Sequence, residues 1–303
     1  MSPFLQELAE PVAAARGVRL LLWRDDLVHP ELPGNKARKL KYNLVAAQQQ
    51  GHNTLLTFGG AYSNHIAAVA AAGRLYGLRT IGLIRGEETL PLNPTLAKAQ
   101  ADGMVLHYLD RSTYRRRHEP SFIAELLARF GPAYVLLEGG TNALALPGCA
   151  ELVTELRQDV AFDILAVAVG TGGTLAGLLT GLAGQQQALG VPALKNGGFL
   201  REEVNALTRQ ASGQVFDNYT LALDYHFGGY AKVPAGLLDF IRQFRERHGV
   251  LLDPIYTGKL LFGVLDLIEQ GYFSRGSTVV AIHTGGQQAW AGWEARFSVR
   301  STQ

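Results

Sequence analysis

The stretch ILAVAVGTGGTLAG, residues 164–177, joins an apolar run, a glycine turn and the start of a helical pattern. A run that is apolar on both faces is typical of a buried parallel strand. In the turn that follows, backbone N–H groups at a helix start form an anion site, and the helix dipole favours a phosphate there. The turn lacks the Gly-Lys-Ser/Thr ending of a Walker loop. A packing turn with Thr174 as the helix cap is the alternative.

Similar apolar runs alternate with helical patterns along the whole chain. Expected strands span 19–23, 54–58, 80–84, 105–109, 134–138, 164–169, 220–224 and 278–282. Expected helices span 36–49, 63–76, 94–101, 119–130, 148–159, 173–188, 234–247, 258–270 and 286–297. This alternation predicts an α/β protein with open parallel sheets and flanking helices. The segment GQQQALG (184–190) is interpreted as a loop, and VPALKNGGFL (191–200) as an irregular one.

Glycine is abundant and clustered, with 35 among 303 residues, whereas the usual share is about 7%. The clusters follow Phe58, Glu138, Val169 and His283, where expected strands end. Ligands of open parallel sheets lie beyond the carboxyl ends of the strands, so these loops predict one shared cleft. Since no linker divides the chain, we expect an inserted smaller α/β domain at 50–142. The larger domain would then comprise 1–49 plus 143–303.

Composition excludes several classes of partner. The formal net charge is +2, which gives no electrostatic reason to expect nucleic acid or an anionic membrane. Residues 1–17 contain acids and no apolar core of signal-peptide length, and no run reaches the roughly 18 apolar residues of a membrane span. Cys149, the single cysteine, is interpreted as a small core residue. We therefore expect a soluble cytoplasmic protein.

The segment GNKARKLKY (34–42) brings Lys36, Arg38, Lys39 and Lys41 to one helix start. Lys36 lies in the first turn, where the dipole repels positive charge and favours the neutral amine that a nucleophilic lysine needs. Leu40 and Leu44 would supply the apolar stripe. From this segment alone, a solvated helix face is the simpler interpretation.

Three further segments contain candidate polar groups. In GGAYSNH (59–65), Ser63 and Asn64 could be ordinary helix caps or donors to a carboxylate or oxyanion. In DPIYTGK (253–259) and AIHTGG (281–286), Tyr256 and His283 could pack and cap or could act on a ligand. No spacing indicates a metal site, and no Gly-x-Ser-x-Gly elbow indicates a hydrolase.

Together, in this order and spacing, GNKARKLKY, GGAYSNH, VGTGGTLAG, LLDPIYTGK and HTGG resemble one family. It is the D-cysteine desulfhydrase and 1-aminocyclopropane-1-carboxylate (ACC) deaminase family of pyridoxal-phosphate (PLP) enzymes. The resemblance covers about residues 19–292. It implies the tryptophan-synthase-β-like fold (PLP fold type II) with the cofactor in the interdomain cleft, a small amino-acid substrate and a homodimer.

The resemblance also implies roles for single residues. Lys36 would be the Schiff-base lysine, with Arg38, Lys39 and Lys41 as solvated or phosphate-side neighbours. Tyr256 and Tyr230 would be active-site tyrosines, Tyr256 assisting proton transfer or nucleophilic attack. Asn64 would bind the ring oxygen of the cofactor, and the substrate carboxylate would meet Ser63, Asn64 and His65. The cofactor phosphate would be held by Gly170, Thr171, Gly172, Gly173 and Thr174.

Thr257 bears on the reaction. The ACC deaminases resembled here have glutamate at this position, which keeps the pyridine nitrogen protonated, whereas the desulfhydrases have threonine. A neutral hydroxyl makes a weaker electron sink, which β-elimination tolerates. The expected reaction converts D-cysteine to pyruvate, sulfide and ammonia, with Lys36 or Tyr256 removing the α-proton. A lysine near pKa 10.4 is a poor base, so desolvation and the charge of the cofactor must lower its pKa.

Two positions depart from the family pattern and leave alternatives open. Tyr62 stands where Gln is usual, and Ala67 where Arg is usual. Tyr62 would crowd the substrate side, so specificity for another amino acid is one hypothesis and ACC deamination is another. A nicotinamide-dependent oxidoreductase would need a closer Gly-x-Gly-x-x-Gly match. A non-catalytic binding protein is opposed by the presence of Lys36, Ser63, Asn64 and Tyr256.

Overall fold

The computed structural model describes residues 2–29, 31–32, 34–286 and 290, and its strands form two sheets. The larger sheet has the order β1-β2-β10-β7-β8-β9, and the smaller has the order β5-β4-β3-β6. Paired strands with an assigned register are parallel except β1, which runs antiparallel to β2. The strands are Leu5–Glu7 (β1), Arg19–Trp23 (β2), Thr54–Gly60 (β3), Arg79–Arg85 (β4), Met104–Leu109 (β5), Tyr134–Leu136 (β6), Ile164–Val169 (β7), Gln187–Pro192 (β8), Tyr219–Leu221 (β9) and Thr278–Ile282 (β10).

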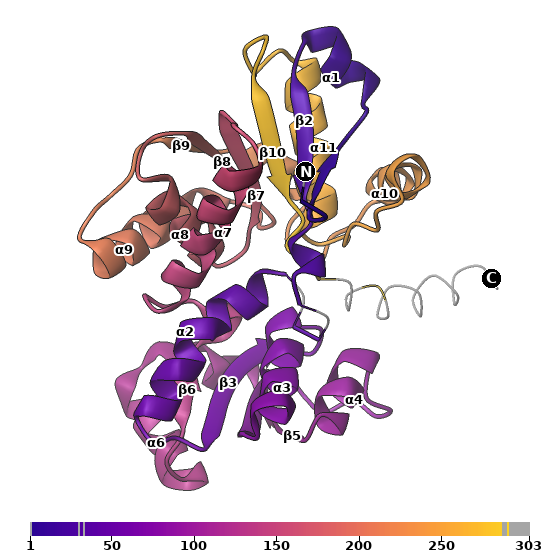
Figure 1. Ribbon diagram of the computed structural model, residues 1–303. Coiled ribbons are helices and arrows are strands. Elements are labelled where there is room, and N and C mark those ends of the chain that lie inside the picture. Colours follow the sequence, from indigo (N-terminus) through magenta and orange to yellow (C-terminus); the bar gives the residue numbers. More distant parts are fainter. Residues whose placement is uncertain (1, 30, 33, 287–289, 291–303) are drawn as a thin grey trace, which may run out of the picture.

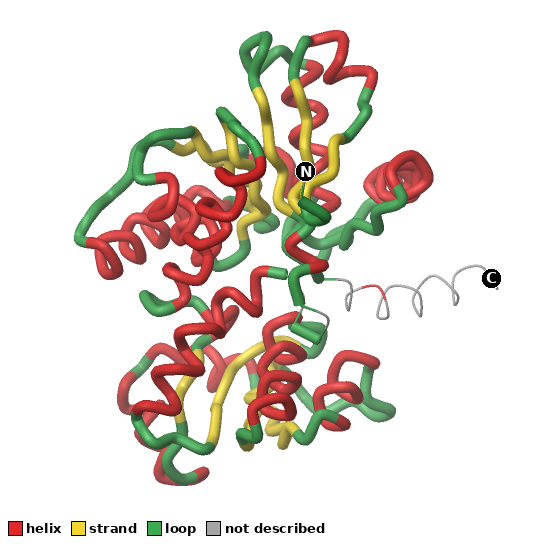
Figure 2. Tube along the Cα trace, in the orientation of Figure 1, coloured by secondary structure: helices red, strands yellow, loops and turns green. Residues whose placement is uncertain are grey.

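Helices surround both sheets, as Figures 1 and 2 show. The helices are Pro11–Arg16 (α1), Asn35–Gln49 (α2), Asn64–Tyr76 (α3), Pro94–Ala101 (α4), Arg111–Arg115 (α5), Pro120–Phe130 (α6), Ala145–Asp159 (α7), Gly173–Leu182 (α8), Leu200–Ser212 (α9), Ala235–His248 (α10) and Thr257–Glu269 (α11). The α/β class with parallel sheets and flanking helices is confirmed.

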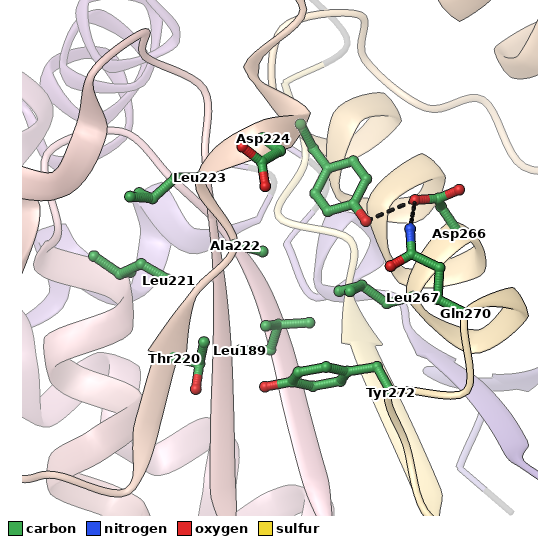
Figure 3. A pocket seen from close by; sticks show the side chains of 11 residues that line it. Leu189, Thr220, Leu221, Ala222, Leu223, Asp224, Asp266, Leu267, Gln270 and Tyr272 are labelled. Carbon is green, nitrogen blue, oxygen red and sulfur yellow. Dashed lines mark hydrogen bonds between the residues drawn. The ribbon is translucent and has the colours of Figure 1, made fainter.

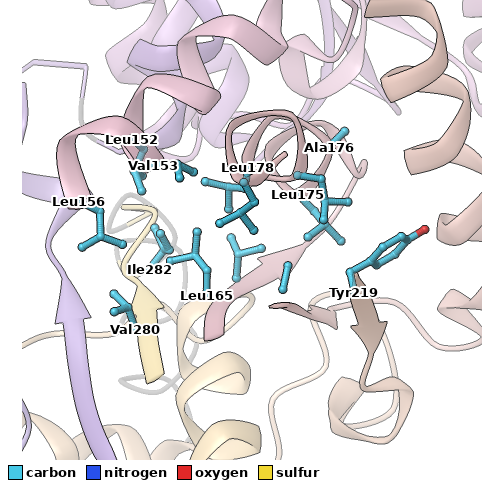
Figure 4. Close-up of a cluster of buried hydrophobic side chains, with 14 of the residues drawn as sticks. Leu152, Val153, Leu156, Leu165, Leu175, Ala176, Leu178, Tyr219, Val280 and Ile282 are labelled. Carbon is cyan, nitrogen blue, oxygen red and sulfur yellow. The ribbon is translucent and has the colours of Figure 1, made fainter. Parts of the chain in front are cut away.

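The larger sheet has an apolar core on each face. Along β7, Leu165 and Val167 enter one core, and Ala166 and Ala168 enter the other. Successive side chains of a strand point to opposite faces, which explains why the whole run 164–169 is apolar. Figure 4 shows the first core, where Leu165 lies with side chains from α7 and α8 and with Ile282 of β10.

The smaller sheet is built from residues 54–136, a continuous segment between the parts that form the larger sheet. Its two faces also have separate cores, one of which includes Leu40 of α2 and Val69 of α3, and the other Phe122 of α6. The domain limits 1–49 plus 143–303, and 50–142, stay a prediction.

The strand β8 was missed by the sequence analysis, which interpreted 184–190 as a loop. Gln187 is exposed, but residues 188–192 are buried between β7 and β9. The glutamines at 185–187 make the segment look polar, so its short apolar run was not recognised. It forms a strand because β7 and β9 pair with it on both sides. The expected helix 173–188 was therefore too long, since α8 ends where Ala183 takes a left-handed φ of 50°.

Smaller differences occur elsewhere. The expected strand 220–224 is limited to β9, and a 3₁₀ helix follows at Leu223–His226. Helices α1, α5 and α9 and strand β1 were not predicted. The expected helix 286–297 lies outside the described residues except for Gly286 and Trp290. Cys149 is buried, as predicted for a core residue. Within the described ranges no helix is long and apolar enough to cross a membrane.

Helix α2 runs between the two sheets (Figure 1) and packs against α7 on one side and α3 on the other. The contact with α7 is unusually close at Gly148. A Cβ atom at this position would lie 2.1 Å from the backbone carbonyl oxygen of Arg38. Glycine at 148 therefore sets the distance between α2 and the larger sheet.

We expect Gly148→Ala to destabilise the protein, because a methyl group would push two backbones apart. Overpacking costs about 1–3 kcal/mol, and rigid backbone on both sides favours the upper end. The matched control is Gly236→Ala in α10, where nothing lies within 4 Å of the added Cβ and the free energy of unfolding should rise by up to about 1 kcal/mol. Thermal and urea unfolding measure both. A Gly148→Ala protein as stable as the wild type would contradict this account of the contact.

Candidate active site

The glycine-rich loops predicted to share a cleft lie against one another. A Cβ atom on Gly139 would be 2.9 Å from the Thr171 hydroxyl, and one on Gly286 would be 3.0 Å from Asn64 Nδ2. The first contact joins the loop after β6 to the loop after β7. The second joins the loop after β10 to the start of α3. Loops from both sheets therefore meet at the start of α2.

Gly34 is the residue that lets α2 begin at this junction. Its φ is 71°, a left-handed value that suits glycine. A Cβ atom here would lie 2.0 Å from the carbonyl oxygen of Thr284, in the HTGG loop. On the next residue, Asn35 Nδ2 donates to Thr174 Oγ1 at 2.8 Å. The starts of α2 and α8 and the HTGG loop are thus held together.

Lys36 and Lys39 lie one turn apart on α2 with no carboxylate within 4.0 Å in the described part of the chain. Lys36 Nζ donates to Asn35 Oδ1 at 2.9 Å. Loss of water around the ammonium lowers the pKa of Lys36 to about 8. Burial, followed by the charge of Lys36, lowers the pKa of Lys39 to about 7. The desolvation expected for a reactive lysine is therefore present at Lys36.

The solvated-face interpretation of this helix was wrong for two of its cations. Arg38 is 6% exposed and bonds Asp25 Oδ1 at 2.7 Å and Glu155 Oε2 at 2.7 Å. Lys39 is 3% exposed and donates to Thr141 Oγ1 at 2.9 Å. Lys41 is solvated, and its ammonium pairs with Glu151. The sequence could not reveal this because most of the groups that accept from these cations lie far away in the chain, 117 residues for Glu155 and about 100 for Gly139 and Thr141.

The turn at 170–174 leads directly into α8, as predicted. Gly172 has a φ of 81° and caps the helix. The Thr171 hydroxyl bonds Thr141 Oγ1, which also accepts from Lys39. A Cβ atom on Gly173 would lie 3.0 Å from Lys39 Nζ. Two hydroxyls and a buried ammonium therefore lie beside the start of α8, where the first N–H groups of a helix have no partner within the helix. This is the chemistry of an anion site, and we call residues 170–174 with Lys39 the anion cradle.

The GGAYSNH turn forms the end of β3 and the start of α3. Ser63 caps α3, accepting from the backbone N–H of His65 at 3.2 Å and of Ile66 at 3.3 Å, so its hydroxyl can still donate. Asn64 Oδ1 is buried and has no hydrogen-bond partner among the described residues. Tyr62 is half-buried in the turn before them. A buried amide oxygen without a partner indicates a place for a polar ligand.

His65 is buried with its ring turned toward β3. Thr57 Oγ1 donates to the carbonyl of Leu136, so it must accept the 2.8 Å bond from His65 Nε2. Burial, with Lys36 and Lys39 nearby, lowers the pKa of His65 well below its ordinary value. The ring N–H of His65 is thus already used inside the protein, and Nδ1 faces inward as an acceptor without a partner in the described ranges.

Asp253, which the sequence analysis did not identify, fixes the segment that contains Tyr256 and Thr257. Its fully buried carboxylate accepts the backbone N–H of Tyr256 at 2.8 Å and of Thr257 at 2.8 Å. The Thr257 hydroxyl donates to Asp253 Oδ2 at 2.7 Å and accepts from the Asp253 backbone at 2.8 Å. Thr257 therefore has one acceptor lone pair left. The Asp-Pro turn before a helix was the signal in the sequence.

Two tyrosines complete the site. The ring of Tyr256 lies about 3 Å from the position of a Cβ on Gly170 (3.1 Å to Cε1), so it stands over the glycine turn. The rings of Tyr230 and Tyr256 meet edge to face with centroids 6.1 Å apart. Burial, then the neighbouring Tyr230, raises the pKa of Tyr256 well above its ordinary value. Tyr256 is accordingly a phenol, not a phenolate, at neutral pH. His283 instead bonds inside the protein: its Nε2 donates to the Leu251 carbonyl at 2.9 Å, and its Nδ1 accepts from the backbone N–H of Gly285 at 3.2 Å.

A pocket separate from these residues lies between the C-terminal half of α11 and strands β8 and β9 (Figure 3). Leu189, Leu221 and Leu267 form an apolar lining, and Asp266 accepts hydrogen bonds from Tyr225 at 2.7 Å and Gln270 at 2.6 Å. None of the predicted site residues lines it. In the part of the chain that the structure describes, no group of three or more His, Cys, Asp or Glu could hold a metal ion.

This combination of a two-sheet α/β fold, an anion cradle and a desolvated lysine defines a class of enzyme that uses an aldehyde cofactor with a phosphate group. Residues 5–285 match the family described as pyridoxal-phosphate dependent enzymes, and the chain belongs to this family. It is a PLP-dependent enzyme with the type II fold, as the resemblance predicted.

Named relatives narrow the class. The chain is 33% identical over 280 residues to a putative 1-aminocyclopropane-1-carboxylate deaminase of Pyrococcus horikoshii, covering 89% of this chain and 85% of that protein. It is 29% identical over 293 residues to D-cysteine desulfhydrase of Salmonella newport, covering 90% and 88%. The solved structure of an ACC deaminase homologue superposes with a TM-score of 0.86 at 31% identity, covering 96% and 91%. The protein is thus a PLP-dependent lyase of the ACC deaminase and D-cysteine desulfhydrase type.

The residues present fit this cofactor. The cradle at 170–174 suits a phosphate, because glycine at 173 leaves the space beside Lys39 that a Cβ would fill. Asn64 Oδ1, which has no partner in the ranges that the structure describes, and the half-buried amine of Lys36 suit the polar groups of the ring.

We expect the cradle to bind sulfate more tightly at pH 6 than at pH 8. Sulfate keeps its charge over this range, whereas Lys39, with a pKa of about 7, loses its proton as the pH rises. Its protonated fraction, and with it the affinity, should fall about tenfold. Lys39→Met should remove most of this dependence, and Lys41→Met, on the solvated side, should retain it. Calorimetric titration of the cofactor-free protein measures both; an unchanged pH dependence in Lys39→Met would place the anion elsewhere.

Proposed function

We propose that this protein catalyses β-elimination of D-cysteine. One D-cysteine and one water would yield pyruvate, hydrogen sulfide and ammonia. The observation that supports this reaction is the contrast between two groups, namely a lysine with a lowered pKa and a tyrosine kept as a phenol. Such a pair suits removal of an α-proton followed by departure of a β-substituent.

When bound, pyridoxal phosphate supplies the electron sink that stabilises negative charge at the α-carbon of the amino acid. In our proposal the amine of Lys36 takes the α-proton. A pKa of about 8 leaves roughly a tenth of this amine neutral at pH 7, where an ordinary lysine would have almost none. The five residues Gly170, Thr171, Gly172, Gly173 and Thr174, with Lys39, would hold the phosphate.

Ser63 and Asn64 would orient the substrate. The Ser63 hydroxyl keeps its hydrogen for the carboxylate, since its oxygen only accepts from the backbone of α3. Asn64 would bind both the cofactor and the substrate, and Tyr62 would border the substrate side. His65 would support this turn from beneath through its bond to Thr57. The dipole of α3 adds attraction for the carboxylate.

Tyr256 favours elimination over ring opening. The α-carbon of ACC bears no hydrogen, so its reaction cannot begin with a proton taken from that carbon and needs another group to attack the ring. Burial keeps Tyr256 protonated, which makes it a weak nucleophile and a suitable proton donor. Tyr230 would hold the Tyr256 ring in place by the edge-to-face contact.

Thr257 supports β-elimination over ACC deamination less strongly than a neutral hydroxyl at this position would suggest. Its hydroxyl hydrogen is directed to Asp253 Oδ2, so it can offer the ring nitrogen only a lone pair. An acceptor favours the protonated nitrogen, as a glutamate would. Asp253 therefore gives Thr257 part of the character of a carboxylate.

ACC deamination is the second candidate function. The names of the Pyrococcus relatives and the ACC deaminase homologue support it, and the acceptor state of Thr257 is compatible with it. Tyr62, where the family has Gln, supports altered specificity within the same reaction class. Homodimer formation and a cytoplasmic location stay predictions from the resemblance.

The deciding experiment supplies purified, PLP-loaded protein with D-cysteine, L-cysteine or ACC. We expect pyruvate and sulfide in equal amounts from D-cysteine and no 2-oxobutanoate from ACC. Tyr256→Phe should retain proton removal, seen as exchange of the α-hydrogen in deuterium oxide, but should release sulfide at least about tenfold more slowly. Turnover of ACC without turnover of D-cysteine would refute the proposal in favour of the second candidate.

Incorporation of the cofactor should follow the protonation of Lys36. A neutral amine is needed to attack the aldehyde, and the folded pKa of about 8 lies below the usual value. The rate of PLP uptake by the apo-protein should therefore rise about tenfold from pH 7 to pH 9 and then level off. Lys36→Ala should never develop the yellow colour, whereas Lys41→Ala should behave as the wild type. A rate that keeps rising to pH 10 would mean that Lys36 is not desolvated.

A further inference from the structure

Lys259 is a fully buried lysine in the first turn of α11, three residues after Tyr256. Its ammonium donates to three backbone carbonyls, those of Gly229 at 2.8 Å, His226 at 2.9 Å and Ala193 at 3.4 Å. No carboxylate lies within 4.0 Å of it in the described part of the chain. The three N–H groups of an ammonium thus meet three neutral oxygens.

The carbonyls belong to segments that need support. The turn after the 3₁₀ helix Leu223–His226 has left-handed φ values at Phe227 (52°) and Ala231 (55°), as well as at Gly228 and Gly229. Side chains other than glycine adopt such values at a cost of about 1–3 kcal/mol each. The turn therefore persists because its surroundings hold it, and the ammonium of Lys259 donates to two of its carbonyls.

This turn leads to Tyr230. The ring of Tyr230 contacts Tyr256, and Tyr256 itself immediately precedes the helix that contains Lys259. The third carbonyl, of Ala193, directly follows β8. One ammonium therefore joins the end of β8, the turn that positions Tyr230 and the helix that positions Tyr256.

The three carbonyls around the Lys259 ammonium resemble the ligands of a bound metal ion more than the carboxylate partner of an ion pair. Rings of backbone carbonyls are the groups with which proteins replace the water shell of a monovalent cation. Burial lowers the pKa of Lys259 to about 8, an effect that the charge of Asp253 opposes. The side chain is thus mainly charged at neutral pH. The carbonyls of His226 and Gly229 each also accept one backbone N–H, whereas that of the buried Ala193 accepts from no other group in the described part of the chain, so a neutral residue at 259 would leave it unpaired.

We propose that Lys259 positions the two active-site tyrosines and that its ammonium substitutes for a bound monovalent cation. The inference rests on the proposed function in one respect, which is that Tyr230 and Tyr256 belong to the active site. The binding of a cation by the three carbonyls does not depend on the proposed function. Without the lysine side chain, the same three carbonyls bind a small external cation such as ammonium or potassium.

The first experiment compares Lys259→Ala with Lys259→Met in buffers of tetramethylammonium, which is too large for the site, and of potassium or ammonium. The wild type should be indifferent to the cation. In tetramethylammonium, Lys259→Ala should lose kcat about tenfold or more, the scale of an unpaired buried acceptor, and ammonium or potassium should restore it. Lys259→Met fills the space without charge and should not be restored. The exposed Lys232→Ala, in the same turn, is the matched control.

A second readout does not depend on the substrate or on the cofactor. The thermal midpoint of apo Lys259→Ala should rise with potassium or ammonium and stay constant in tetramethylammonium, with no such response in Lys259→Met. This response would stand even if D-cysteine were not the substrate. A Lys259→Ala protein with wild-type kcat in tetramethylammonium, or one whose activity and midpoint ignore every cation, would overturn the proposal.

If Lys259→Ala does not fold, Lys259→Gln provides the test, since its amide still donates two hydrogen bonds. Hydrogen exchange should then accelerate at residues 226–231 and remain unchanged in β7 and β10. Exchange at 226–231 equal to that of the wild type would contradict a positioning role.

Discussion

The architecture of the site depends on the backbone contact between Gly34 and Thr284. Because residue 34 has no side chain, the carbonyl of Thr284 can approach its backbone closely. A Cβ atom placed on Gly34 would lie only 2.0 Å from this carbonyl oxygen. This contact fixes the start of α2 against the loop that follows β10, and Lys36 lies two residues later. Asn35 adds a bond to Thr174, so the lysine and the anion cradle take their relative position from the same few residues.

Helix α2 is held in this position by buried charge and by close packing. Arg38 neutralises Asp25, which is fully buried, and reaches Glu155 of α7 as well. Removing one member of such a buried pair leaves an uncompensated charge, which costs about 3–5 kcal/mol. Gly148 then brings α7 close to the backbone of α2. The cations that follow Lys36 therefore fasten the helix to the larger sheet or face the cradle, and only Lys41 is mainly solvated.

Three lysines show how the same side chain is adapted to different tasks by its surroundings. Desolvation lowers the pKa of Lys36, Lys39 and Lys259 alike, but their hydrogen-bond partners differ. Among the described residues, the Lys36 ammonium donates only to the amide oxygen of Asn35, which suits the reactive role proposed for it. Lys39 donates to a hydroxyl and a carbonyl beside the anion cradle, and Lys259 donates to three carbonyls. The number of hydrogen-bond acceptors, more than the pKa, distinguishes Lys36, which we propose to be the reactive lysine, from Lys259, which we propose to position the tyrosines.

The sequence by itself determined the fold class and the order of the glycine turns, because apolar runs such as 164–169 and left-handed glycines are local requirements. It also indicated Lys36, Ser63, Asn64, Tyr256 and the turn at 170–174. Only the tertiary structure decided that β8 is a strand, that Arg38 and Lys39 are buried, and that the Lys259 ammonium bonds the carbonyls of the turn before Tyr230. Burial and hydrogen bonding of these groups depend on partners far apart in the chain, 117 residues for Arg38 and Glu155 and 66 for Lys259 and Ala193, and no local pattern encodes such contacts.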